Sequence, residues 1–225
     1  QIAGHHGSIT RYAVTMPAPP PSAVLLLLVG GGGILDLDSR GCPLQLDRNA
    51  LVRMQPLLQA AGIATALVDA PSDYAEADGL AGFRIDPQHA DDLGKVIADL
   101  RRRTGAAVWL AGESRGSLSA ANAAARLSGP AAPDGVILLS AMMVGDSRAR
   151  KAFVAQTVFD LPLAAVKMPV LLIGHAADNC VRSPATMLGR VAGKTAAVRQ
   201  QIAIVSGGPV APGRPPSLAA CEVGQ

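Results

Sequence analysis

A serine stands between two glycines in the run Gly112-Glu113-Ser114-Arg115-Gly116, and this spacing can prepare a serine for covalent chemistry. The run follows an apolar stretch, residues 106–111, and precedes a helix-like stretch, residues 117–127. A strand, such a turn and a helix form a nucleophile elbow, which presents the serine oxygen to a substrate. The turn tolerates almost no side chain two residues to either side of the serine, hence glycine at both places. We therefore predict Ser114 as a nucleophile.

A serine nucleophile needs a base, an acid that orients the base, and N–H donors for the oxyanion. In an elbow, one donor is the backbone N–H of the residue after the serine, here Arg115. The other donor comes from a loop after an earlier strand, and Gly30-Gly31-Gly32-Gly33 follows the apolar run 23–29. We expect Gly32 and Gly33 to be the donors, because glycine leaves its N–H unobstructed. An ordinary flexible turn is the alternative.

The elements that must position these residues alternate between strand and helix along the chain. Continuous apolar runs are typical of strands buried on both faces, and alternation with helices indicates a parallel sheet. We predict a single domain over residues 1–225, a three-layer α/β/α sandwich with a mainly parallel sheet. Residues 1–22 are an N-terminal lead-in with an edge strand in 8–16, and 206–225 form a C-terminal loop. The expected strands are 23–29, 63–68, 106–111, 135–139, 170–173 and 197–205, and the expected helices are 49–61, 87–103, 115–127, 147–157 and 184–191.

With the glycine loop, the elbow and an aspartate after a late strand, the chain resembles the α/β-hydrolase superfamily from residue 23 to residue 205. The stretch Val68-Asp69-Ala70-Pro71-Ser72-Asp73, Phe83-Arg84 and His89-Ala90-x-Asp92 look like a bacterial branch of uncharacterised, esterase-like serine hydrolases. The resemblance implies the α/β-hydrolase fold and hydrolysis of carboxylic esters or related acyl substrates. Acyl transfer would use the same residues, and a binding protein on the same scaffold is a further alternative.

The same resemblance points to Asp178 as the acid of the site, because it follows the strand 170–173 in a short loop. A turn-forming aspartate is the alternative, and Asp146 is the second candidate. In the superfamily the base is a histidine that follows the acid, but no histidine follows His175 here. We expect this chain to stop short of the base and of the last helix. A catalytically impaired relative is the alternative.

The four histidines of the chain do not fit the role of the base. His175 is only three residues before Asp178, and His89 opens a helix upstream of the elbow. We expect His175 to be a packed or structural histidine, and His89 has the wrong chain order for the base. His5 and His6 are expected to form a solvated pair near the N-terminus.

Two of the three cysteines lie where a disulfide would support the site. Cys180 is two residues after Asp178, and Cys221 is in the segment where the base should arrive. We predict a Cys180–Cys221 disulfide, with two unpaired thiols as the alternative. The bond would indicate an oxidising compartment, so we expect a periplasmic or secreted protein, with a cytoplasmic one as the alternative.

Composition excludes several other classes of function. Hydrophobic residues are 49% and charged residues 16% of the chain, which is typical of a globular protein with a large core. A net charge of +3 with 3% aromatic residues does not indicate nucleic-acid binding. No apolar run is long enough for a membrane span. We expect a small acyl molecule as the partner, and neither a metal nor a cofactor.

Overall fold

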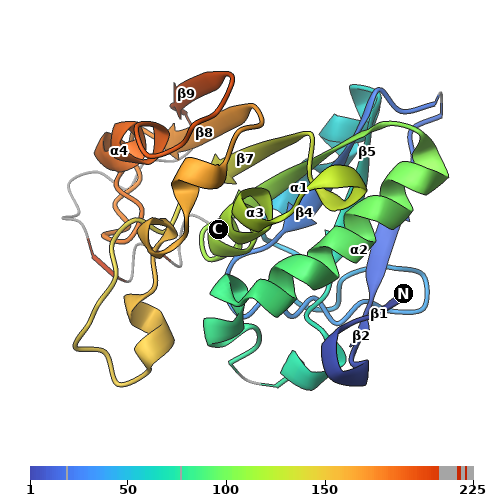
Figure 1. Cartoon of the computed structure of the whole chain (residues 1–225), viewed down its shortest axis with the longest axis horizontal. Helices are drawn as coiled ribbons and strands as arrows, with labels where there is room; N and C mark the ends of the chain where they lie inside the picture. Colours follow the sequence, from blue (N-terminus) through green and yellow to red (C-terminus); the bar gives the residue numbers. More distant parts are fainter. Residues whose placement is uncertain (19, 77, 208–216, 219–220, 222–225) are drawn as a thin grey trace.

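The structure is a computed structural model that describes residues 1–18, 20–76, 78–207, 217, 218 and 221. These residues form a seven-stranded sheet with the strand order β3-β5-β4-β6-β7-β8-β9 (Figure 1). Strand β3 is antiparallel to β5, and all other neighbours are parallel. Strands β1 and β2 form a separate two-stranded sheet. The strands are β1 (Ile2–Ala3), β2 (Ile9–Thr10), β3 (Tyr12–Thr15), β4 (Ala23–Leu28), β5 (Ile63–Val68), β6 (Ala107–Glu113), β7 (Gly135–Leu139), β8 (Val170–His175) and β9 (Gln200–Val205).

Helices lie on both faces of the large sheet, with α2 and α3 on one face and α1 on the other (Figure 1). Asp86 caps the N-terminus of α2 by accepting the N–H of Gln88, 2.8 Å away, as its position before Pro87 predicts. None of the described helices is long and apolar enough to cross a membrane. The α-helices are α1 (Ala50–Ala60), α2 (Pro87–Thr104), α3 (Gly116–Arg126) and α4 (Leu188–Ala192), and the 3₁₀ helices are η1 (His5–Gly7), η2 (Ser72–Tyr74), η3 (Ala81–Ile85), η4 (Gly129–Ala131), η5 (Ala152–Ala155), η6 (Val158–Asp160), η7 (Leu163–Ala165) and η8 (Ala185–Met187).

The two faces of the sheet bury separate hydrophobic clusters, because successive side chains of a strand point to opposite faces. On β4, Leu26 is in the cluster that contains Ile97 of α2. Its neighbour Leu27 is in the other cluster, with Leu51 of α1. This arrangement explains why the whole of β4 is apolar, and it confirms the predicted α/β class.

Parallel strands end at the same edge of a sheet, and this edge collects the residues singled out in the sequence. The glycine loop 30–33 follows β4, Ser114 follows β6, and Asp178 lies three residues after β8. The sheet therefore brings these three chain segments together.

The predicted helix 147–157 is wrong. Residues 152–155 form the short 3₁₀ helix η5, and residues 147–151 are not helical. The chain turns back on itself here: the N–H of Asp146 donates to the carbonyl of Val154, 3.2 Å away. A β-carbon on Gly145 would lie 1.9 Å from the carbonyl oxygen of Ala155. These close backbone contacts override the helical preference of the segment.

Two other predicted elements differ in part from the structure. The expected helix 184–191 is divided into η8 and α4. The expected strand 197–205 begins only at Gln200, as β9. Most of the expected C-terminal loop 206–225, and with it the prediction of a missing last helix, lies outside the described residues.

Candidate active site

Ser114 occupies a sharp turn between β6 and α3. Its φ is +50°, in the left-handed region that residues with side chains rarely adopt. A β-carbon on Gly112 would lie 2.4 Å from the carbonyl oxygen of Gly116, and one on Gly116 would lie 1.9 Å from that of Leu28. The turn therefore requires glycine at both positions, as the elbow pattern predicts.

Hydrogen bonds to the neighbouring strand and to the first turn of α3 hold the turn at Ser114. The N–H of Ser114 donates to the carbonyl of Leu139 at the end of β7, 3.0 Å away. The hydroxyl of Ser117 donates to the carbonyl of Ser114, at 2.6 Å, and accepts the N–H of Met142, at 3.0 Å. The Ser114 side chain is half-buried, and its Oγ lies 4.0 Å from Sδ of Met142. Ser114 is thus held in an unusual backbone conformation at the carboxyl edge of the sheet.

The glycine loop lies directly beside Ser114. A β-carbon on Gly30 would be 3.0 Å from Cβ of Ser114. The N–H of Gly33 donates to the carbonyl of Gly30, 3.1 Å away, so a turn within the loop uses this amide. For the N–H of Gly32, no acceptor is found among the described residues. Of the two predicted donors, Gly32 therefore suits the oxyanion better, and the roles of both remain predictions.

Arg115 is the N-cap residue of α3, at the helix end where backbone N–H groups lack acceptors within the helix. Its backbone therefore fits the predicted oxyanion role, which remains a prediction. Its side chain extends away from the turn: the guanidinium lies 4.4 Å from the ring centre of Phe153 and donates to the carbonyl of Ala81, at 3.1 Å. Burial lowers the pKa of this guanidinium.

Glu113 is a buried carboxyl group that the sequence analysis did not assign to the site. It accepts the N–H of Gly30, at 3.2 Å, and Nδ2 of Asn49, at 2.8 Å. Burial raises the pKa of Glu113, against the opposing effect of these two hydrogen bonds. Glu113 links the elbow to the glycine loop. The signal in the sequence that could have indicated this role was an acidic residue at the end of an apolar strand.

Arg84 is a second residue that sequence reasoning missed as part of the site. It comes from η3, and its side chain is 1% exposed beneath the glycine loop. Burial lowers its pKa to about 9. A single arginine between the apolar neighbours Phe83 and Ile85 was the signal in the sequence.

The loop after β8 holds Asp178 by both carboxylate oxygens. Oδ1 accepts the N–H of Cys180, at 2.8 Å, and Oδ2 accepts the hydroxyl of Ser183, at 3.0 Å. The charge of Asp178 is a lesser cause, after burial, of the raised pKa of Glu113. The second candidate, Asp146, instead accepts the N–H of Arg148 in an exposed turn. The structure therefore favours Asp178 as the acid, which stays a prediction.

The predicted disulfide between Cys180 and Cys221 is present. It joins the loop of Asp178 to the C-terminal segment, in which Ser217 also donates its N–H to the carbonyl of Asn179, at 2.9 Å. The third cysteine, Cys42, is free and exposed. A covalent bond therefore fastens the loop that carries Asp178.

Both ring nitrogens of His175, but only Nε2 of His89, contact other polar groups among the described residues. Nδ1 of His175 accepts the N–H of Ala177, at 3.1 Å, so the proton on Nε2 donates to the carbonyl of Gly207, 3.0 Å away. His89 is buried, and its Nε2 lies 2.8 Å from Oγ of Ser119. Burial lowers the pKa of His89 to about 3, which keeps it neutral. The contacts of the half-buried His175 agree with the structural role expected for it, and the burial of His89 is a finding of the structure.

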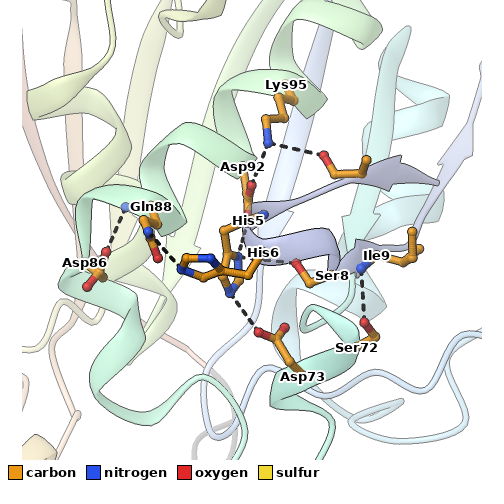
Figure 2. Close-up of polar contacts among 11 residues, drawn as sticks. His5, His6, Ser8, Ile9, Ser72, Asp73, Asp86, Gln88, Asp92 and Lys95 are labelled. Atoms are coloured by element: carbon orange, nitrogen blue, oxygen red, sulfur yellow. Dashed lines mark hydrogen bonds and ion pairs between the residues drawn. The ribbon is translucent and has the colours of Figure 1, made fainter.

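The expectation of a solvated His5–His6 pair is wrong for His5. Figure 2 shows its ring between two carboxylates: Nδ1 lies 2.6 Å from Asp92, and Nε2 lies 2.8 Å from Asp73. The His5 side chain is only 7% exposed. His6 contacts the side chain of Gln88, at 3.3 Å. The fold buries His5 because α2 passes beside the N-terminal segment, which the sequence pattern did not reveal.

Among the described residues, no group of three or more His, Cys, Asp or Glu side chains is arranged to hold a metal ion. The groups gathered at the carboxyl edge are instead a serine, backbone N–H donors and a carboxylate. Such groups can form and stabilise an acyl intermediate.

No protein-family model and no curated protein sequence matches the chain, but many solved structures resemble it. Dienelactone hydrolase from Anabaena variabilis is 21% identical, with a TM-score of 0.61, and the match covers 94% of this chain and 87% of that one. The α/β hydrolase GrgF from Penicillium is 11% identical, with a TM-score of 0.61 and coverages of 94% and 90%. A soluble variant of monoglyceride lipase from Saccharomyces cerevisiae is 10% identical, with a TM-score of 0.66 and coverages of 94% and 86%. The chain therefore has the α/β-hydrolase fold.

Proposed function

We propose that this protein is a serine hydrolase of carboxylic esters or related acyl substrates. The observation that carries the proposal is the backbone of Ser114, held at a φ of +50° between two glycines that no larger residue could replace. Strain of this kind persists only where the surrounding structure enforces it, and it is typical of active sites. The similarity in fold to a dienelactone hydrolase and a monoglyceride lipase supports the same class of reaction.

In the proposed reaction, Oγ of Ser114 attacks the acyl carbon while its proton passes to a base. The bond from Oγ to carbon forms, and the carbonyl oxygen becomes an oxyanion that accepts the N–H groups of Arg115 and the glycine loop. The intermediate collapses, the alcohol leaves with a proton, and an acyl group stays on Ser114. Water then attacks this ester and releases the acid.

We propose that the base is not one of the four histidines in this chain. Both ring nitrogens of His5 and of His175 contact other groups, and His6 contacts Gln88. His89 is buried, with its Nε2 against Ser119. The carboxylate of Asp178 would orient an imidazole from elsewhere, so imidazole added to the solution should accelerate acylation of Ser114.

The segment between β7 and β8 contains only the short 3₁₀ helices η5, η6 and η7. Such a segment cannot form a large lid over the site, which supports a preference for small or flexible acyl groups. We therefore expect short-chain p-nitrophenyl esters to be cleaved faster than long-chain ones.

The first prediction concerns Ser114 itself. A fluorophosphonate should label the wild-type chain at Ser114, and added imidazole should make this labelling faster. Ser114→Ala should remove the labelling and at least 99% of the ester cleavage, since removing a nucleophile costs several powers of ten. Intact-mass measurement and peptide mapping check the site. Ser140→Ala is the matched control, because Ser140 also has a positive φ, +41°, at the end of a strand.

Three outcomes would count against the proposal. Equal ester cleavage by the wild type and Ser114→Ala would exclude the serine mechanism. Binding of an acyl compound without labelling or turnover would instead indicate a binding protein. Transfer of the acyl group to an added alcohol in preference to water would indicate an acyltransferase.

A further inference from the structure

The guanidinium of Arg84 binds the backbone of the glycine loop from below. Its Nη2 donates to the carbonyls of Val29 and Gly31, both at 3.1 Å, and approaches that of Gly30 at 3.5 Å. Its Nη1 donates to Oγ of Ser119, at 2.9 Å. No carboxylate bonds to Arg84 among the described residues. A buried charge without an ion pair is costly, so its retention calls for a specific reason.

The bonds to Arg84 fix the direction of the loop amides. None of the described peptide bonds is cis, and in a trans peptide group the carbonyl and the N–H point in opposite directions. The carbonyls of residues 29–31 converge on Arg84. The N–H groups of residues 30–32 must therefore point away from the guanidinium.

The direction that leads away from Arg84 is the direction of the elbow. The N–H of Gly30 reaches the carboxylate of Glu113, the residue immediately before Ser114. The next two amides, those of Gly31 and Gly32, have no acceptor among the described residues. A β-carbon on Gly31 would meet no atom within 4 Å, so open space surrounds that part of the loop.

We propose that Arg84 is a positioning residue, which directs the N–H groups of Gly31 and Gly32 toward the oxyanion formed at Ser114. The inference rests on the proposed function and adds Gly31 to the predicted donors, in place of Gly33. The positive charge attracts the carbonyl ends of the peptide dipoles, so their N–H ends are aligned before the reaction begins. Donors aligned in advance need no reorganisation when the oxyanion forms, which is the main source of their catalytic effect.

The test compares Arg84→Met, which removes the hydrogen bonds, with Arg84→Lys, which keeps the charge and one donor group. Amide hydrogen exchange at Gly31 and Gly32 measures the loop, and the rate of fluorophosphonate labelling at Ser114 measures its use. For Arg84→Met we expect exchange about tenfold faster and labelling about tenfold slower, a part of the hundredfold or larger loss known for a missing oxyanion donor. Arg84→Lys should recover part of both, and in ester cleavage kcat should fall while KM stays within twofold.

Arg101→Met is the matched control. Arg101 also donates to a backbone carbonyl, that of Ala132 at 2.9 Å, and to Asp134, but before the start of β7 and thus at the opposite edge of the sheet. The rate of fluorophosphonate labelling at Ser114 in Arg101→Met should stay within twofold of the wild-type rate.

The outcomes separate this inference from the proposed function. Unchanged exchange at Gly31 and Gly32 in the Arg84 variants would overturn the positioning role. Faster exchange with an unchanged labelling rate would also overturn it, because the loop would then not serve the reaction. If Arg84→Met does not fold, Arg84→Lys decides by the same measurements. A wild type that is never labelled at Ser114 would refute the proposed function, and with it the catalytic use of the loop.

Discussion

Buried charged side chains hold the loop that follows β4. Arg84 binds its carbonyls, and Glu113 binds the N–H of Gly30. Further along, the carboxylate of Asp69 accepts the N–H groups of Leu35, at 2.7 Å, and Leu37, at 3.0 Å. A buried loop has no ladder of backbone hydrogen bonds, so its polar groups need other partners. Charged groups form the strongest such bonds, which keeps this loop ordered beside Ser114.

His5 makes a second cluster of this kind outside the site. Because Asp92 and Asp73 are both acceptors, the ring must be protonated at both nitrogens to bond to each. Burial lowers the pKa of His5, but the hydrogen bond to Asp92 and the charge of Asp73 together raise it above 6.5. The pKa of Asp92 is lowered, since its bonds to His5 and Lys95 outweigh its burial.

The signs of these shifts predict a pH dependence of stability. A raised histidine pKa stabilises the fold below pH 6.5, and this contribution disappears as the pH rises through the higher folded pKa. The lowered pKa of Asp92 stabilises the fold above the ordinary aspartate pKa and is lost in acid. Denaturant unfolding of the wild type from pH 5 to pH 9 should therefore show stability declining on the alkaline side.

His5→Gln should remove most of this decline. At pH 6 it should cost about 2 kcal/mol, the scale of a hydrogen bond to a charged group, and at pH 9 much less. His6→Gln is the control, because His6 bonds only to the exposed side chain of Gln88 in the described structure. Equal pH profiles for the wild type and His5→Gln would contradict the prediction.

Among the elements, the contact between β4 and the start of α3 sets the geometry of the elbow. The carbonyl of Leu28 and the backbone of Gly116 lie so close that no β-carbon fits between them. This approach lets α3 begin directly above the sheet and turns Ser114 outward. The geometry at Ser114 therefore depends on β4, a strand that lies far from it in the sequence.

Gly116→Ala should disrupt this contact. We expect a loss of about 3 kcal/mol or more in the free energy of unfolding, because the backbone must shift, together with loss of labelling at Ser114. Thermal unfolding and fluorophosphonate labelling check both. Gly189→Ala in α4 is the control, because a β-carbon there meets nothing within 4 Å and alanine favours a helix. Normal labelling of Gly116→Ala would show that the elbow tolerates a side chain.

The elements that the sequence predicts well are those determined by local patterns. The mainly apolar runs 63–68 and 135–139 match β5 and β7 to the residue, because a strand buried on both faces is almost continuously apolar. The segment 147–157 was mispredicted because its structure depends on contacts from outside it. The guanidinium of Arg182 donates to the carbonyl of Val154, 2.8 Å away, and the helical preference of the segment cannot anticipate this.

The same distinction holds for the site. The spacing of glycines around Ser114 and the place of Asp178 after a strand are local features, and both residues lie at the predicted edge. The pairing of Cys180 with Cys221 could be inferred because two loops had to meet there. Arg84 and Glu113 could not be assigned, because their partners are peptide groups of a loop distant in the sequence.

At the scale of the whole molecule, the disulfide closes a long loop of chain. Its cysteines are 41 residues apart, and a bond of this kind restricts the unfolded chain. It also fixes the loop of Asp178 to the C-terminal segment. Disulfides persist in oxidising compartments, which supports our proposal of a periplasmic or secreted protein.

Reduction of this bond should lower the free energy of unfolding by about 2–4 kcal/mol, the usual range for a disulfide. It should also slow ester cleavage, because the acid loop loses its attachment. The double variant Cys180→Ser and Cys221→Ser should behave like the reduced wild type and no longer respond to dithiothreitol. Cys42→Ser, which changes a free exposed thiol, should respond to dithiothreitol like the wild type. A reduced protein as stable as the oxidised one would contradict the prediction.

The contact between Leu28 and Gly116 also has a consequence for the order of folding. Contacts between distant parts of a chain form slowly, because the intervening loop must first be closed. The contact that helps to hold Ser114 in its left-handed conformation therefore forms only when β4 and β6 come together. We therefore expect the proposed reactivity of Ser114 to be acquired late in refolding, so that pulse labelling would record the moment at which the central strands come together.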